Sequence, residues 1–226
     1  MKKTIVSAMA LCAAAGVASA DVYGDSTGEL FDNSFTHLDI SSVTITNDAT
    51  WLNITIQTAG DVAATDWGKY AIGIDTGKIA GDNSNGWGRN IDWARNITHW
   101  SALWADSGGG GEIYHYDAGW QLDDATYAAG TDIQHDLSLN FVGIVNLKLS
   151  LAVLGVGVGD TIDFDVITTG GGADPGVDHL SRADMATPGW GDTSVSGAFS
   201  SYTIVPAPGS VALLGLGGLI AARRRR

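Results

Sequence analysis

Hydrophobic and polar residues alternate one by one in three short segments of the chain. Because successive side chains of a β-strand point to opposite faces, each segment predicts a strand with one buried face. The buried positions are expected to be Leu52, Ile54 and Ile56, then Tyr70, Ile72 and Ile74, then Val145, Leu147, Leu149 and Leu151. Similar patterns predict further strands over residues 38–46, 97–104, 112–116, 137–142, 161–168 and 200–205.

The segments between these strands are rich in glycine, aspartate and asparagine, which favour turns. Glycine clusters within residues 81–88, 108–111 and 170–176 predict loops. No segment shows the hydrophobic period of a long amphipathic helix. About nine short strands without such a helix predict an all-β fold, a single jelly-roll-like β-sandwich over residues 21–204.

The first residues of the chain have the three parts of a secretory signal peptide. Lys2 and Lys3 form a positive start, residues 4–17 are almost entirely apolar or small, and Ala18-Ser19-Ala20 fits a signal-peptidase site. We therefore expect residues 1–20 to be removed and the mature protein to begin at Asp21. The only cysteine, Cys12, leaves with this segment, so the mature protein is expected to form no disulfide.

The end of the chain carries a second apolar run, over residues 211–222, followed by Arg223, Arg224, Arg225 and Arg226. As a helix this run would be about 18 Å long, against a bilayer core of about 30 Å. Cationic flanks stay on the cytoplasmic side, so the arginines would orient the helix while the signal peptide exports everything before it. The run could serve as a transient sorting helix or as a permanent tail anchor.

The residues before this run complete a recognisable order. A motif with two prolines, then a short glycine-rich apolar helix, then an arginine cluster, resembles the PEP-CTERM sorting signal, where Ala207 replaces the usual glutamate. The resemblance implies processing by an exosortase and delivery to the cell surface or an extracellular polymer matrix, typically in Gram-negative bacteria. It covers residues 205–226, and the motif is Val205, Pro206, Ala207, Pro208, Gly209 and Ser210.

The region between the two signals is strongly acidic. The signals hold six of the twelve basic residues and none of the 25 acidic ones, which leaves residues 21–204 with a formal charge of −19. Such a surface argues against nucleic acid or an anionic membrane as a partner. It suits a protein that is soluble in salty water or collects divalent cations.

Four short motifs give the central domain a second resemblance. Residues 21–25 (Asp-Val-Tyr-Gly-Asp), 38–40, 70–75 and 147–151 are similar to segments of DOMON-like and family 9 carbohydrate-binding β-sandwiches. The resemblance implies a structural calcium ion near the mature N-terminus and aromatic side chains that hold sugar.

Calcium is the first ligand that the residues themselves suggest. It prefers six to eight oxygen ligands, and carboxylates of Asp21, Asp25 and Asp39 could supply some of them. The alternative is that these aspartates cap turns and remain solvated. A further acidic loop contains Asp174, Asp178 and Asp184.

Tryptophan suggests a polysaccharide partner. Trp87 and Trp93 lie in a glycine-rich region, where flat indoles could stack on sugar rings while nearby polar groups bind hydroxyls. The alternative is that these side chains belong to the core, as tryptophans in β-sandwiches often do.

No catalytic motif is found in the sequence. The histidines are scattered, no serine lies in a nucleophile elbow, and no pair among the many acids is singled out as a glycosidase pair. We therefore expect an exported, non-catalytic structural or adhesive protein. A carbohydrate-binding module is the alternative, and a glycan-active enzyme comes third.

The C-terminal run predicts that the mature protein ends near the Val205–Pro206 junction. Since the run is too short for a lasting anchor, mass spectrometry of protein from the producing cells should show a chain that begins at Asp21 and lacks the arginines. Replacing residues 223–226 by serine should leave the precursor unprocessed. Intact surface protein that still carries Arg226 would identify the tail as a permanent anchor.

Overall fold

A computed structural model describes residues 20–65, 67–128 and 130–207 of the chain. The expected signal peptide, apart from Ala20, and the expected sorting segment beyond Ala207 lie outside these residues. Within the described part, no helix is long and apolar enough to cross a membrane.

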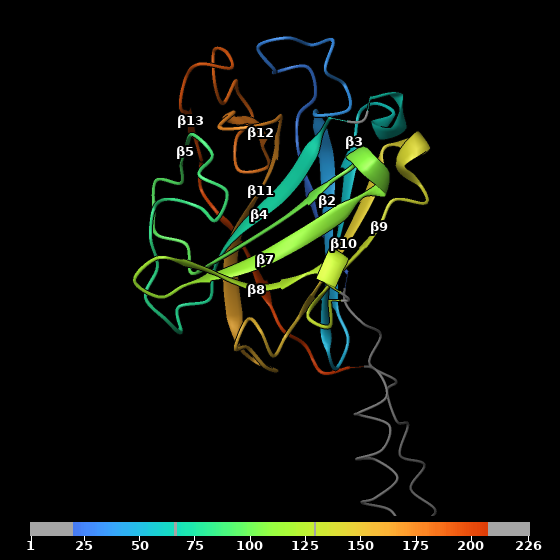
Figure 1. Ribbon diagram of the computed structural model, residues 1–226. Helices are drawn as coiled ribbons and strands as arrows, with labels where there is room; N and C mark the ends of the chain where they lie inside the picture. The colour runs from blue at the N-terminus through green and yellow to red at the C-terminus, as the bar shows by residue number, and fades with distance from the viewer. Residues whose placement is uncertain (1–19, 66, 129, 208–226) are drawn as a thin grey trace, which may run out of the picture.

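The first sheet has five antiparallel strands in the order β1-β2-β3-β10-β9 (Figure 1). Its inward side chains are apolar and its outward ones polar, which is the alternation that the sequence shows. The strands are β1 (Asp21–Gly24), β2 (Ile40–Asn47), β3 (Trp51–Thr58), β9 (Ile133–Asp136) and β10 (Ile144–Ser150).

The second sheet has seven antiparallel strands. Six follow the order β12-β11-β4-β6-β7-β8, and β14 pairs with the first half of β11, before the part that β12 occupies. The strands are β4 (Lys69–Asp75), β6 (His99–Trp104), β7 (Gly110–Tyr116), β8 (Trp120–Ala125), β11 (Thr161–Thr169), β12 (Gly176–His179) and β14 (Ser200–Thr203).

A few short elements complete the described chain. A parallel pair joins two short strands, and four single turns of 3₁₀ helix lie in the connections. These elements are β5 (Ile91–Asp92), β13 (Ser194–Val195), η1 (Val62–Ala64), η2 (Asp106–Gly108), η3 (Thr126–Ala128) and η4 (Asn140–Val142).

The two sheets pack face to face around one hydrophobic core, as in a β-sandwich. Val43 and Ile54 from the first sheet lie in the same buried cluster as Ile72 and Phe164 from the second. Burying this apolar surface is the main favourable term for the fold.

A second hydrophobic layer covers the outer face of the seven-stranded sheet. Trp93, which directly follows β5 in the connection between β4 and β6, is fully buried there against Trp100. Its ring lies so close to β4 that a Cβ added to Gly73 would come within 2.9 Å of it. The central strands β4 and β11 are therefore buried on both faces, whereas the sequence pattern predicted one buried face for β4.

Both ends of the described chain lie at one end of the sandwich. Asp21 pairs with Ile45, and the side chain of Asn47 exchanges two hydrogen bonds of 2.9 Å with the backbone of Val205. The loop between β1 and β2 and strand β12 lie at the opposite end (Figure 1).

The all-β class and most strand positions are confirmed, but the strand predicted over residues 137–142 is wrong. That segment is a turn followed by η4, because Asp136 accepts a hydrogen bond from the Ser138 amide and Gly143 adopts φ 77° after it. Leu139 and Phe141, which suggested a buried strand, are exposed. The edge strand is β9 instead, a few residues earlier.

The burial of Trp93 leads to a stability prediction. Trp93→Ala should lower the free energy of unfolding by about 3–5 kcal/mol, because it leaves a cavity between two buried layers. Urea unfolding followed by circular dichroism measures this. The matched control is Trp51→Ala, at a half-buried position on the outer face of β3, which should cost clearly less. Equal costs would mean that Trp93 does not pack as described.

Candidate metal centre

Four carboxylates meet at the end of the sandwich opposite the chain ends. Asp25 directly follows β1, Glu29 lies in the next loop, Asp39 directly precedes β2, and Asp178 lies on β12. Carboxylate oxygens of Asp25, Glu29 and Asp178 lie within 4.8 Å of one another. Two sheets and one loop therefore converge on this point.

Hydrophobic packing holds these elements in place. Leu30 and Leu38 from the loop pack against Val177, the neighbour of Asp178 on β12. Phe31 and Phe35 extend this cluster as partly buried rings. The loop that carries Glu29 is thus fixed to the strand that carries Asp178.

The hydrogen bonds of the four carboxylates leave several oxygens free. Asp178 accepts from the amides of Ile40 and His179, at 2.6 and 2.7 Å. Asp39 accepts from the Gly28 amide through Oδ2, and Asp25 accepts from the Ser26 amide through Oδ1. Among the described residues, no other residue donates to Asp25 Oδ2, Asp39 Oδ1 or either oxygen of Glu29, although all four atoms are buried.

No basic side chain of the described chain forms an ion pair with these acids; the ion pairs found there all lie elsewhere. Burial raises the pKa of Asp25 to about 8 and that of Asp178 to about 9, and repulsion from neighbouring carboxylates adds to both shifts. Burial likewise raises the pKa of Glu29 and Asp39, with a further contribution from Asp39 at Glu29.

Such a group of oxygens matches what a hard divalent cation requires. Calcium takes carboxylate and carbonyl oxygens in flexible geometry, and a bound cation would offset the cost of burying like charges together. Asp25, Glu29 and Asp178 are the residues that could hold it, with Asp39 beside them.

The structure places the sequence-predicted metal residues in two different regions. Asp25 and Asp39 take part in the cluster, but Asp21 lies at the far end of β1, about 13 Å away along an extended strand. Its charge acts on Tyr23 and Tyr202 instead. Asp21 is near Asp25 in sequence, but three residues of extended chain separate the two and keep their side chains apart.

The two residues that replace Asp21 were not assigned to this site. Asp178 appeared in the sequence only within a separate acidic loop; Asp184 of that loop is exposed and pairs with Arg182. Glu29 was not singled out at all. The sequence feature that could have drawn attention to Glu29 is the rarity of glutamate, because the chain contains only one other, Glu112.

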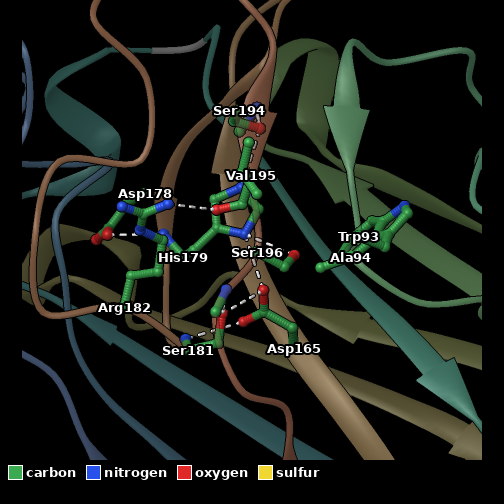
Figure 2. Close-up of polar contacts among 12 residues, drawn as sticks. Trp93, Ala94, Asp165, Asp178, His179, Ser181, Arg182, Ser194, Val195 and Ser196 are labelled. Atoms are coloured by element: carbon green, nitrogen blue, oxygen red, sulfur yellow. Dashed lines mark hydrogen bonds and ion pairs between the residues drawn. The ribbon is translucent and has the colours of Figure 1, made fainter.

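The residue after Asp178 is the centre of a buried polar network (Figure 2). His179 contacts Asp165 Oδ2 through Nδ1 at 2.8 Å and Ser194 Oγ through Nε2 at 3.0 Å. Ser181 donates to Asp165 through both its amide and its hydroxyl. Since neighbours on a strand point to opposite sides, this network fixes His179 on one side while Asp178 reaches the carboxylate cluster on the other.

Ser194, His179 and Asp165 share the hydrogen-bond order of a serine-hydrolase triad. All three side chains are fully buried, so the Ser194 hydroxyl has no contact with solvent in this conformation. Its oxygen also accepts a hydrogen bond from the Gly176 amide. The arrangement ties β11, β12 and β13 together, and no local motif in the sequence marks it, because its members lie on three different strands.

The structure also places the two predicted sugar-binding tryptophans, Trp87 and Trp93, in different environments. Trp93 is fully buried and cannot stack on a sugar, so that assignment is wrong. Trp87 is half-buried; its Nε1 donates to Glu112 Oε2 at 2.6 Å, and its ring contacts Trp100 and Trp104. Trp87 therefore belongs to the edge of the second hydrophobic layer.

No protein-family model matches the chain, and no curated protein is significantly similar to it in sequence. Function is therefore inferred from the chain's own residues and contacts.

The raised pKa values predict how the cation-free protein responds to pH. A carboxyl whose pKa is higher in the folded state stabilises the fold below its unfolded pKa of about 4, and this stability is lost as pH rises toward the folded value. For Asp25 and Asp178 that range extends to pH 8 and 9. In chelator, the melting temperature should therefore fall between pH 5 and pH 8.

Asp25→Asn should make this slope shallower, because an amide can keep the Ser26 hydrogen bond but cannot lose a proton. Asp21→Asn removes the same charge away from the cluster and should keep the slope. Identical slopes for the two variants would show that general acidic repulsion, rather than this cluster, causes the pH dependence.

Proposed function

We propose that the protein is an exported, non-catalytic structural or adhesive component of the cell surface or extracellular polymer matrix, and that calcium stabilises its β-sandwich domain. The observation that carries the cation part is the set of buried carboxylate oxygens of Asp25, Glu29 and Asp39 that lack hydrogen-bond donors among the described residues. For the fold itself, we propose that the strands of the β-sandwich follow a jelly-roll-like topology.

The proposed export of the protein favours calcium as the ion that this cluster binds. Extracellular modules bind calcium with dissociation constants of about 10⁻⁴–10⁻³ M, which suits an environment where the ion is plentiful. The same cluster would be a liability without the ion, because its acids would have to be protonated or would repel one another. Folding would then be favoured after export.

The position of the cluster agrees with display on a surface. The chain leaves the domain where Asn47 bonds to the Val205 backbone, at the end opposite strand β12 and the loop between β1 and β2 (Figure 1). A sorting tail that begins at Val205 would hold that end toward the membrane during processing. The cation site would then face away from the membrane.

A non-catalytic role is part of the proposal. The arrangement of Ser194, His179 and Asp165 is sealed inside the protein and connects three strands. The hydrogen bonds among these three side chains have a structural role, because they connect the strands.

Calcium should raise the melting temperature of the protein at pH 7.5 after chelator is removed. An ion at 100 times its dissociation constant stabilises the native state by about 2.7 kcal/mol, which corresponds to about 5–10 °C for a domain of this size. Differential scanning fluorimetry measures the shift. Magnesium should give a smaller one, because it needs tighter octahedral geometry.

Glu29→Gln should reduce the calcium-induced shift to less than about half, since it removes a charged ligand. The matched control is the same exchange at the other glutamate, Glu112, whose carboxylate binds Trp87, Tyr114 and Tyr127. Glu112→Gln can lower the starting stability, but it should keep the calcium-induced shift. An unchanged shift in Glu29→Gln would rule this cluster out as the site.

A further inference from the structure

The outer face of the five-stranded sheet carries two rows of polar side chains. In each row, residues that are directly opposite one another in β2, β3, β10 and β9 form a line across the sheet. The first row is Thr44, Thr55, Asn146 and Asp136, and the second is Thr46, Asn53, Lys148 and Gln134.

A hollow of about 350 Å³ lies over the part of these rows that belongs to β3, β9 and β10. Its polar walls are the side chains of Asn53, Thr55, Gln134, Asp136, Asn146 and Lys148. These side chains are half-buried or exposed, and they face away from the hydrophobic core. A ligand could therefore reach them directly from solvent.

Much of the hydrogen-bonding capacity of these groups is unused within the described chain. Thr55 donates to Asn146 Oδ1 at 2.7 Å, which leaves both amide hydrogens of Asn146 available. Asp136 accepts from the Ser138 amide through Oδ1, and the Ser138 hydroxyl also interacts with this carboxylate. No hydrogen bond or ion pair within the described residues occupies the side chains of Gln134 and Lys148. The hollow thus offers donors and acceptors side by side.

The charge of this face differs from that of the domain. Its two rows contain one acid, Asp136, and one base, Lys148, so their formal charges cancel, whereas residues 21–204 carry −19. The face therefore carries no net charge that would favour a cationic or an anionic ligand. Trp51, half-buried at the end of β3, lies on the same face as Asn53 and could add an aromatic surface.

We propose that this face binds an internal stretch of a neutral polysaccharide chain. Sugar hydroxyls both donate and accept, so they match a surface on which amides, hydroxyls and a carboxylate alternate. Neighbouring strands are about 5 Å apart, so successive groups in a row can contact successive hydroxyls. A peptide would instead add to a strand edge, and a nucleic acid would need a basic surface.

This site is separate from the carboxylate cluster, which lies at the end of the sandwich and involves β12 of the other sheet. The two inferences can fail independently. Glu29→Gln should leave polysaccharide binding unchanged when calcium is in excess.

The test uses the full-length protein in calcium buffer. Affinity gel electrophoresis with hydroxyethyl cellulose, galactomannan and xylan detects binding, and isothermal titration measures it. At least one of these neutral polymers should retard the protein. The double variant Gln134→Ala/Asn146→Ala should weaken binding by about tenfold to 100-fold, because two hydrogen-bonding groups are lost. Trp51→Ala should weaken it by about tenfold if the indole stacks on the chain.

The matched control is Gln121→Ala, which removes an exposed glutamine from β8 of the other sheet and should leave the affinity unchanged. Because Gln134 is exposed, Gln134→Ala alone gives a second readout if the double variant is unstable, and melting temperatures check the fold of each. The proposal is overturned if no neutral polymer binds, or if the Gln134 and Asn146 variants bind as the unmodified protein does. Binding to alginate alone, lost in Lys148→Ala, would also overturn it.

Discussion

Burying like charges together is the constraint that shapes one end of this molecule. Asp25, Glu29, Asp39 and Asp178 share a site where several carboxylate oxygens are buried and, within the described chain, no basic side chain pairs with them. The elements that carry them are the start of β2, the loop before it and β12, so both sheets meet at this point. A cation would turn the repulsion into a link between the sheets. Without one, protonation has to neutralise the cluster, and stability then depends on pH.

The buried network around His179 makes this end of the molecule rigid. Asp165 on β11 and Ser194 on β13 bond to the imidazole from two sides, and Ser181 donates further hydrogen bonds to Asp165. A fully satisfied polar network in a low-dielectric interior specifies one arrangement of the chain. Because Asp178 is the residue before His179 on β12, its position follows from that of His179. The geometry of the carboxylate cluster is therefore set from inside the protein, before any ion binds.

The sequence predicted the class of fold well, because alternation along β3 and β10 reports directly on a buried face. It failed where tertiary contacts decide the outcome. Phe141 looks like a strand residue but lies exposed in a 3₁₀ turn, and β4 is buried on both sides because Trp93, from the segment that connects β4 to β6, folds back over it. For the candidate site, Asp25 and Asp39 were found through local acidity. Asp178 comes from the other sheet, and only the fold brings it close, as a contact across 138 residues with Ile40 shows.

The two outer faces of the sandwich differ in solvent access: one is covered by apolar side chains, and the other is polar and open. The segment that contains Trp93 covers the outer face of the seven-stranded sheet, so Trp93 and Trp100 stabilise the fold and are withdrawn from solvent, whereas Trp87 remains half-buried at the edge of this layer. On the five-stranded sheet, polar rows around Asn53 and Asn146 remain accessible over a hollow. A face needed only for solubility in an acidic domain could carry scattered carboxylates, as the loops do. Amides and hydroxyls in register instead provide repeated, directional hydrogen bonds, which is the property that recognition of a repeating neutral polymer requires.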